Sequence, residues 1–285
     1  MRRSLLFIPG NNPSMIQNSD VFESDTVIID LEDAVNIAEK DSARNLVKSY
    51  LDNKESFKTE IVIRINGLDT SFYMDDLNAI VSDKIDAIML PKAHVCDLVK
   101  LDELLTEIEG KNHLTKKIKI IPIVELAESL IEVEGIAKAN RVDGILLGAE
   151  DFSSDMEVIR TKEGEEISYA RSRIATCCMA NRIDPIDTPF TDTKDLEGLE
   201  RDCDKALSLG MKAKSAIHPN QIENINNKFA PTMKQIEWAK RITEAKIDAD
   251  KRGLGAFSVD GKMVDKPVIE RAEKILKKAS AYKLL

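Results

Sequence analysis

The sequence predicts a single α/β domain, a (β/α)8 TIM barrel, followed by a C-terminal helical extension. Short apolar runs alternate with amphipathic stretches, and each apolar run ends at a polar residue, a glycine or a proline. A short apolar run bounded in this way is typical of a strand buried on both faces. Alternation of such strands with helices implies a parallel sheet. Eight units in about 220 residues favour a closed barrel over an open sheet.

Eight apolar runs are the candidate strands. The clearest two are Ile120–Val124, which ends at Glu125, and Ile145–Leu147, which is followed by Glu150 and Asp151. The carboxyl ends of barrel strands meet at one mouth, where barrel enzymes bind their substrates. The other six candidates, in chain order, are Leu5–Ile8, Val27–Leu31, Ile61–Ile65, Ala87–Leu90, Asp184–Thr188 and Lys214–Ile217.

The stretches between these runs carry apolar residues at helical spacing, with charged residues on the opposite side. The last helix of this alternating part is followed by Gly210, a typical helix stop. The predicted helices are Ala34–Leu51, Leu98–Ile108, Leu130–Ala139, Gly164–Ala180 and Lys194–Leu209.

The alternation stops near residue 231. Thr232–Asp250 is predicted to be a long amphipathic helix, joined by a loop at Lys251–Gly255 to a short hairpin at Ala256–Val264 that turns at Asp260-Gly261. Asp265–Leu284 is predicted to be a last helix. We therefore divide the chain into a catalytic barrel at 1–230 and an extension at 231–285. The extension is too small to fold alone and should pack on the barrel or on a neighbouring subunit.

Composition excludes several classes of function. A net charge of −9 and a pI near 5.1 argue against nucleic acid or an anionic membrane as a partner. No apolar run approaches the length of about 18 residues that a membrane span needs. The first apolar run stops at Pro9-Gly10, too early for a signal peptide. We expect a cytoplasmic protein with reduced, buried thiols, because no metal-site spacing relates Cys96, Cys177, Cys178 and Cys203.

Carboxylates gather at the predicted strand ends. Glu125 and Asp151 are the strongest pair, and Glu32, Asp33 and Glu150 occupy equivalent places. Each could instead be a helix cap or part of a surface ion pair. Five like charges at one barrel mouth would repel one another, however, so a bound cation is the favoured explanation. Oxygen ligands of this kind suit Mg²⁺.

Several basic residues are candidates for anion binding. Arg64 lies inside an apolar strand, so it either pairs with a carboxylate in the barrel or faces an anionic substrate. Lys92 follows a strand, where a cation near the acidic cluster is favoured over a Schiff-base lysine. Lys40 and Arg44 are four residues apart, and their spacing alone favours a solvated helix surface. His218 could be a base or a structural cap. The nucleotide-binding signatures GxGxxG and GxxxxGK[ST] are absent.

Longer blocks of distinctive sequence run along essentially the whole chain and include LLFIPGNNPSM, DTVIIDLEDAVNIAEKDSAR, VIRINGLDT, PIVELAESL, GAEDFSSDMEVIRTKEGEEISYAR and GKMVDKPVIERA. These blocks resemble the citrate lyase beta-subunit family, within a wider family of malyl-CoA and citramalyl-CoA lyases built on the same barrel. The resemblance implies Mg²⁺-dependent retro-Claisen cleavage of a citryl thioester, on an acyl carrier protein or on CoA. The products would be oxaloacetate and an acetyl thioester.

The resemblance also implies roles for individual residues. The resemblance gives Glu125 and Asp151 as the metal ligands, the same two carboxylates chosen above, and it makes Glu125 a substrate-binding residue as well. Arg64 matches a residue that contacts the substrate, and Asp265 matches an acid/base aspartate supplied by the tail of a neighbouring subunit. Lys40 and Arg44 match positions near CoA-type phosphates, which reverses the conclusion from spacing. The implied assembly is a homotrimer that works with an alpha subunit and an acyl carrier protein.

Other readings remain open at this point. One is an enzyme of the same family with another substrate, such as a citramalyl-CoA or malyl-CoA lyase or a malate-synthase-like thioesterase. Another is a phosphoenolpyruvate-type barrel aldolase, which would have no affinity for a pantetheine thioester. A third is a non-catalytic assembly subunit. The presence of Glu125, Asp151, Arg64 and Asp265 together counts against this last reading.

Overall fold

The computed structural model describes residues 1–251, 253 and 256–285. The chain divides into two compact units, Arg2–Asn226 and Asn227–Leu285, the second of which also includes Met1. Three residues of the predicted loop at Lys251–Gly255, namely Arg252, Leu254 and Gly255, lie outside the described residues.

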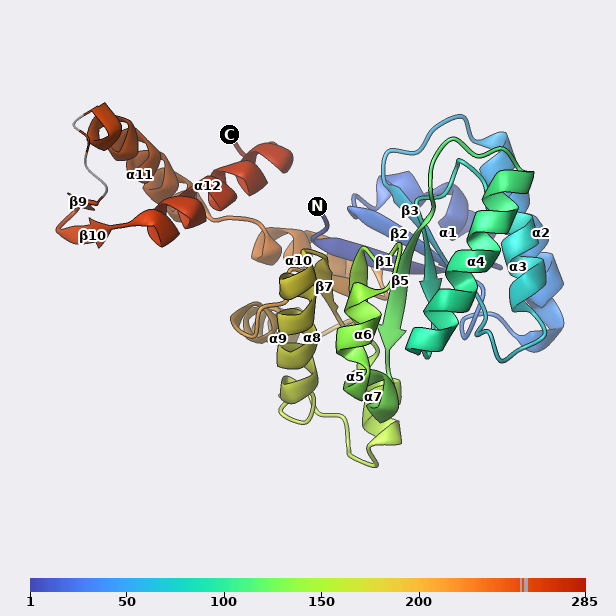
Figure 1. The fold of residues 1–285 in the computed structure, drawn as a ribbon. Helices are drawn as coiled ribbons and strands as arrows, with labels where there is room; N and C mark the ends of the chain where they lie inside the picture. Colours follow the sequence, from blue (N-terminus) through green and yellow to red (C-terminus); the bar gives the residue numbers. More distant parts are fainter. Residues whose placement is uncertain (252, 254–255) are drawn as a thin grey trace. The chain divides into compact units, whose positions relative to one another are not determined.

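The first unit is a closed barrel of eight parallel strands, which confirms the predicted fold class (Figure 1). Strand β1 pairs with both β2 and β8, so that Leu5 faces Thr26 on one side and Ser215 on the other, and this closes the barrel. The strands are β1 Ser4–Pro9, β2 Thr26–Asp30, β3 Glu60–Arg64, β4 Ala87–Leu90, β5 Lys119–Val124, β6 Gly144–Leu147, β7 Asp184–Asp187 and β8 Ala213–Ala216.

Helices and 3₁₀ turns follow the strands in alternation. The helices are α1 Pro13–Gln17, α2 Lys40–Asn53, α3 Tyr73–Ile80, α4 Val95–Lys111, α5 Ala127–Ile131, α6 Val133–Lys138, α7 Ala149–Asp155, α8 Ser168–Asn181, α9 Leu196–Ser208 and α10 Ile222–Phe229, with 3₁₀ turns η1 Ser19–Val21, η2 Ile37–Glu39 and η3 Pro219–Gln221. None of the helices in the described part of the chain is both long and apolar enough to cross a membrane.

Several helices differ from their predicted extents: α8 begins at Ser168 rather than at Gly164, and α4 runs from Val95 to Lys111. The helix expected from Ala34 begins only at Lys40, because the Asp30 carboxylate accepts hydrogen bonds from the backbone N–H groups of Glu32 and Ala34, at 2.9 and 3.1 Å. These bonds hold the chain after β2 in a turn. The stretch predicted as one helix from Leu130 is instead the two short helices α5 and α6.

The alternation of side chains along the strands decides which residues reach the mouth. The interior of the barrel is filled by one face of each strand, including Ile28 of β2, Val62 of β3 and Ile186 of β7. Since successive side chains point to opposite faces, residues two positions further on share the interior direction. Those residues are Asp30, Arg64 and Thr188, and by the same count Glu125 follows the interior residue Ile123 of β5.

The second unit consists of α11 (Met233–Lys251), a hairpin of β9 (Phe257–Val259) and β10 (Lys262–Val264), and α12 (Lys266–Ala281). Its core contains Ala239, Ile242, Val264 and Ala272. The hairpin turns at Asp260-Gly261, where both residues have positive φ, 52° and 74°, as a two-residue hairpin turn requires. The predicted hairpin and both predicted helices are confirmed.

The cysteines are all free thiols. Cys177, Cys178 and Cys203 are buried as expected, but Cys96 is exposed, so the prediction of burial is wrong for this residue. Cys96 lies in the first turn of α4, two positions before the buried Leu98 and therefore on the opposite side of the helix.

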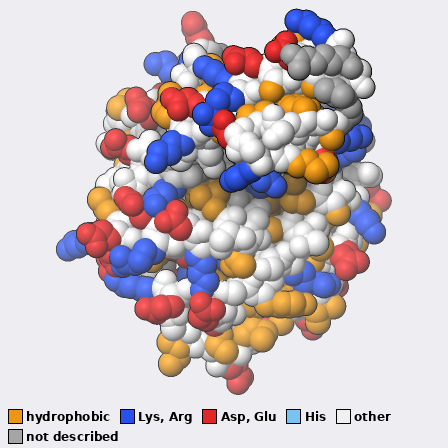
Figure 2. Space-filling model, turned by 90° about the vertical axis from the view of Figure 1, so that its left-hand side faces the viewer, with side chains coloured by type: hydrophobic (Ala, Val, Ile, Leu, Met, Phe, Trp, Pro, Cys, Tyr) orange, Lys and Arg blue, Asp and Glu red, His pale blue; other side chains and the backbone are white. Residues whose placement is uncertain are grey.

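The surface drawn in Figure 2 mixes charges of both signs. Lys and Arg side chains are interspersed with Asp and Glu side chains, and no continuous basic area covers the described residues on this face. A surface of this kind does not attract a polyanion strongly.

Candidate active site

A pocket of about 400 Å³ opens at the carboxyl ends of the strands of the first unit. Its described lining carries five carboxylates and a single guanidinium, that of Arg64. These carboxylates are Asp30, Asp33, Glu125, Glu150 and Asp151. The pocket therefore has an excess of negative charge, which favours a cationic occupant.

Arg64 is held in place by two acidic side chains. Its Nε and Nη2 donate to the two carboxylate oxygens of Asp30 at 2.7 and 2.6 Å, and its Nη1 lies 2.9 Å from Oε2 of Glu32. Burial opposes the positive charge, but the hydrogen bond and charge of Asp30 outweigh burial and raise the pKa of Arg64. The structure thus shows the pairing with a barrel carboxylate, and the side chain also lines the pocket.

Glu125 is almost fully buried at the end of β5. Its Oε1 accepts a hydrogen bond from the backbone N–H of Lys92 at 2.7 Å. Burial, together with the charges of Asp151 and Glu32, raises the pKa of Glu125 to about 8, although the Lys92 N–H and Arg64 act in the opposite direction. A nearby cation would remove this penalty, because it would favour the charged carboxylate.

A glycine is required beside Glu125. A Cβ atom added at Gly148 would lie 2.6 Å from both Cβ and Oε2 of Glu125 and 2.9 Å from Ile123. Only a residue without a side chain therefore lets the Glu125 carboxylate lie against the junction of β6 and α7.

Asp151 and Glu150 lie in the first turn of α7, a helix that the sequence analysis did not predict. Glu150 is half exposed, and one carboxylate oxygen lies 3.4 Å from Nε of Arg160. Asp33 is largely exposed and 3.8 Å from Nη1 of Arg64. Glu32 is more enclosed, and burial and neighbouring acidic charges raise its pKa to about 7 against the opposing charge of Arg64.

The donor set fits a magnesium ion. Glu125 and Asp151 line one pocket and lie close enough for the charge of Asp151 to raise the pKa of Glu125. Among the described residues, no group of three or more His, Cys, Asp or Glu side chains could hold a metal ion by itself. Two protein carboxylates with the remaining positions filled by water and substrate oxygens is an ordinary arrangement for Mg²⁺.

Lys40 and Arg44 are buried, so the solvated helix surface expected from their spacing is wrong. Lys40 Nζ donates to the carbonyl oxygens of Leu31 and Glu32, both at 2.7 Å. Arg44 forms hydrogen bonds with Asp76 and Asp41. The turn after β2 places Lys40, at the start of α2, against the end of that strand, whereas Arg44 has its buried partner Asp76 on the neighbouring helix α3. Their proximity to phosphates stays a prediction.

The remaining candidates have local roles. His218 accepts a hydrogen bond from the Asn220 backbone and thereby caps η3. The backbone of Lys92 positions Glu125, and its side chain is exposed. Asp265 belongs to the second unit, where it caps the start of α12 and accepts from the Val268 N–H.

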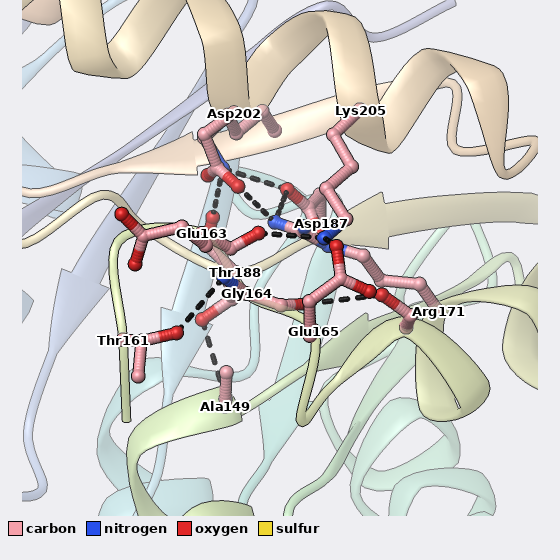
Figure 3. A network of polar contacts seen from close by, with 12 residues as sticks. Ala149, Thr161, Glu163, Gly164, Glu165, Arg171, Asp187, Thr188, Asp202 and Lys205 are labelled. Atoms are coloured by element: carbon pink, nitrogen blue, oxygen red, sulfur yellow. Dashed lines mark hydrogen bonds and ion pairs between the residues drawn. The ribbon is translucent and has the colours of Figure 1, made fainter. Parts of the chain in front are cut away.

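A buried cluster of four charges lies behind β7 and β8, and the sequence analysis missed it (Figure 3). Arg171 of α8 donates to both carboxylate oxygens of Asp187 at 2.8 and 2.9 Å and to Asp202 of α9 at 2.6 Å. Lys214 of β8 donates to both aspartates at 2.6 Å. The side chains are at most 1% exposed, and the two positive charges balance the two negative ones.

The cluster leads to a pocket residue that was also missed, Thr188. Lys214 Nζ donates to the Thr188 carbonyl at 2.7 Å, and the Thr188 hydroxyl accepts from the backbone N–H of Ala149 at 3.2 Å. One sequence feature could have revealed the cluster: Lys214 is a charged residue in a predicted strand, as Arg64 is, and a buried cation of this kind needs an acidic partner.

Comparison with known proteins places these features in a family. Residues 3–219 match the model of the HpcH/HpaI aldolase/citrate lyase family. The chain is 40% identical to a citrate lyase subunit beta of Leuconostoc mesenteroides subsp. cremoris, over 100% of this chain and 95% of the relative. It is 33% identical to an L-malyl-CoA/beta-methylmalyl-CoA lyase of Cereibacter sphaeroides, over 97% and 94% of the two chains. Among solved structures it resembles the protein CitE of Mycobacterium tuberculosis in complex with magnesium, acetoacetate and coenzyme A, with 28% identity, a TM-score of 0.77 and 97% coverage of each chain.

Proposed function

The chain belongs to the HpcH/HpaI aldolase/citrate lyase family, and we propose that it cleaves a citryl thioester into oxaloacetate and an acetyl thioester by retro-Claisen chemistry. The observation that carries this proposal is the convergence of Glu125, Asp151 and Arg64 on one pocket at the barrel mouth. The magnesium and coenzyme A bound to the related CitE support it.

The reaction removes a proton from a tertiary hydroxyl, breaks the adjacent carbon–carbon bond and leaves a thioester enolate that must be protonated. Magnesium held by Glu125 and Asp151 would supply Lewis-acid stabilisation of the hydroxy-acid oxygens. Arg64 would offset the negative charge that develops on the enolate oxygen. Two hydrogen bonds to Asp30 already fix the guanidinium group of Arg64, so it needs little reorganisation when negative charge develops on the enolate oxygen.

Proton transfer is assigned to Asp265, on the basis of the family resemblance. In this proposal Asp265 comes from the tail of a neighbouring copy in a homotrimer. A carboxylate suits the task because it can accept the hydroxyl proton and return one to the enolate carbon. We further propose that the chain works with a citrate lyase alpha subunit and an acyl carrier protein, as the names of its relatives suggest.

The test is an assay of the purified chain with citryl-CoA, with and without Mg²⁺, in which malate dehydrogenase converts the released oxaloacetate. We expect Mg²⁺-dependent product from the native chain and none from Asp151→Ala. Asp75→Ala is the matched control, because Asp75 also lies in the first turn of a helix but away from the pocket. Oxaloacetate release that persists in Asp151→Ala would contradict the proposed metal site.

A malyl-type lyase is the second candidate, favoured by the 33% identity to the malyl-CoA lyase of Cereibacter sphaeroides. Malyl-CoA and citramalyl-CoA therefore enter the same assay, with glyoxylate or pyruvate as the product that is followed. Faster cleavage of either substrate would replace the citryl assignment. Cleavage of citryl bound to carrier protein, without cleavage of citryl-CoA, would assign the carrier-dependent form of the reaction.

A further inference from the structure

Helix α7, which carries Asp151, begins without a cap of its own. Its N-cap residue is Gly148, and the cap position makes no side-chain hydrogen bond. The first N–H groups of a helix have no partner within the helix and need one elsewhere when they are buried. Glu125 excludes any side chain at Gly148, so a cap by serine, threonine or aspartate at this position is impossible.

The missing acceptor comes from the next strand. Thr188 follows β7 and points into the pocket, and its hydroxyl oxygen accepts from the N–H of Ala149, the first residue of α7. Thr188 and Ala149 are both completely buried, so no water can replace this contact. Figure 3 shows Thr188 between Ala149 and two residues of the four-charge cluster, Asp187 and Asp202.

The backbone around Thr188 is itself fixed by buried donors. Lys214 Nζ donates to the carbonyl of Thr188 at 2.7 Å, and Ser215 Oγ donates to that of Asp187 at 2.8 Å. Gln221 Nε2 donates to the carbonyl of Phe190, also at 2.8 Å. Pro189 lies between Thr188 and Phe190, and its fixed φ angle further restricts this backbone. The balanced charge cluster thus places Thr188, and Thr188 places the first turn of α7.

We propose that Thr188 is a positioning residue for the metal site: it caps α7 from the neighbouring strand and so fixes Asp151 opposite Glu125. Without it, the N–H of Ala149 would be buried and unpaired, and the first turn of α7 would shift or fray. This inference rests on the proposed magnesium site, and it does not depend on which thioester is cleaved.

Three variants test the inference. Thr188→Val keeps the shape of the side chain but removes the acceptor, whereas Thr188→Ser keeps the hydroxyl. Thr26→Val is the matched control, because it makes the same change at another fully buried threonine, at the start of β2, whose hydroxyl donates to Glu60 and touches neither α7 nor the backbone around Thr188. Titration calorimetry with Mg²⁺ alone measures affinity without any substrate. Hydrogen exchange of peptides covering 149–156, without metal, reports the order of α7 directly.

We expect Thr188→Val to weaken Mg²⁺ binding by about tenfold, the lower end of what loss of an orienting partner costs. Exchange in 149–156 should accelerate in this variant, while Thr188→Ser and Thr26→Val stay within about twofold of the native chain. If the chain cleaves a thioester, Thr188→Val should need a higher Mg²⁺ concentration to reach half of its maximal rate. At saturating Mg²⁺, its kcat should return to most of the native value.

Several results would overturn the inference. Native Mg²⁺ affinity in Thr188→Val would do so, as would an equal loss in Thr26→Val, which would show a general effect of removing a buried hydroxyl from the barrel. A native chain that binds no Mg²⁺ would remove both the inference and the proposed metal site. If no citryl thioester is cleaved but Thr188→Val still weakens Mg²⁺ binding, the proposed function falls and the positioning role stands.

Discussion

Replacement of Lys214 by methionine tests the energetics of the buried charge cluster. Lys214 is fully buried and donates to Asp187, Asp202 and the Thr188 carbonyl at 2.6–2.7 Å. Burial opposes its charge, but the two aspartates raise the pKa of Lys214, so the ammonium form is present. Methionine fills most of the volume, so the main effect is electrostatic.

The variant leaves two buried aspartates to share Arg171, with one uncompensated negative charge. Removing one partner of a buried ion pair typically costs about 3–5 kcal/mol, so we expect a loss of about 4 kcal/mol in the free energy of unfolding. For a chain of this size that corresponds to a decrease in Tm of roughly 8–16 °C. The second substitution Asp202→Asn restores neutrality and should recover about half of the loss.

The assay is urea or thermal unfolding followed by far-UV circular dichroism. Tryptophan fluorescence is unsuitable for the barrel, because the single tryptophan, Trp238, lies in α11 of the C-terminal unit. A loss below about 1 kcal/mol in Lys214→Met would refute the electrostatic reasoning. So would a double variant whose loss equals the sum of the two single losses, because independent sites add.

Three further outcomes are expected. Arg64→Lys keeps the charge but loses the two-pronged contact with Asp30, so kcat/KM should fall by about 100-fold, as when one oriented donor is removed, with little change in Tm; unchanged kcat/KM would contradict the assigned role. Gly148→Ala places a methyl group 2.6 Å from Glu125 and should weaken Mg²⁺ binding in calorimetry, and native affinity would refute the steric argument. Hydrogen bonds from Thr161 and Arg160 outweigh burial and lower the pKa of Glu166 to about 2, so the stability it gives its loop is present above about pH 4.5 and is lost as the pH falls toward 2. Proteolysis confined to residues 157–167 should accelerate over that range, and a Glu166→Gln variant should show no such pH dependence.

Most of the strands could be predicted from sequence because strands buried on both faces are largely apolar, although β7 and β8 also carry the charged residues Asp187 and Lys214. The pair Glu125 and Asp151 could be predicted for a related reason, since carboxylates at strand ends in a barrel have only one mouth to face. Both inferences use local sequence and one topological rule. They required no knowledge of which side chains touch.

The residues that were missed depend on contacts between distant positions. Lys40 was assigned to a solvated surface because the turn made by Asp30 cannot be read from helical spacing. Arg171 and Lys214 are 43 positions apart in the sequence and meet only through Asp187 and Asp202. Thr188 acts on a helix that starts 39 residues earlier in the chain. Register and helix packing create these pairs, and no pattern within one segment encodes them.

The exposure of Cys96 has a practical consequence for spectroscopy. It is the one exposed thiol of the four, and the other three lie in α8 and α9 with buried side chains. A maleimide dye should therefore attach to the native sequence at a single place, without mutagenesis. Cys96 is four residues beyond Lys92, whose backbone holds Glu125. A dye there would sit at the start of α4, which follows β4 on the side of the barrel where the strands end, so its emission can be followed while metal or thioester is added.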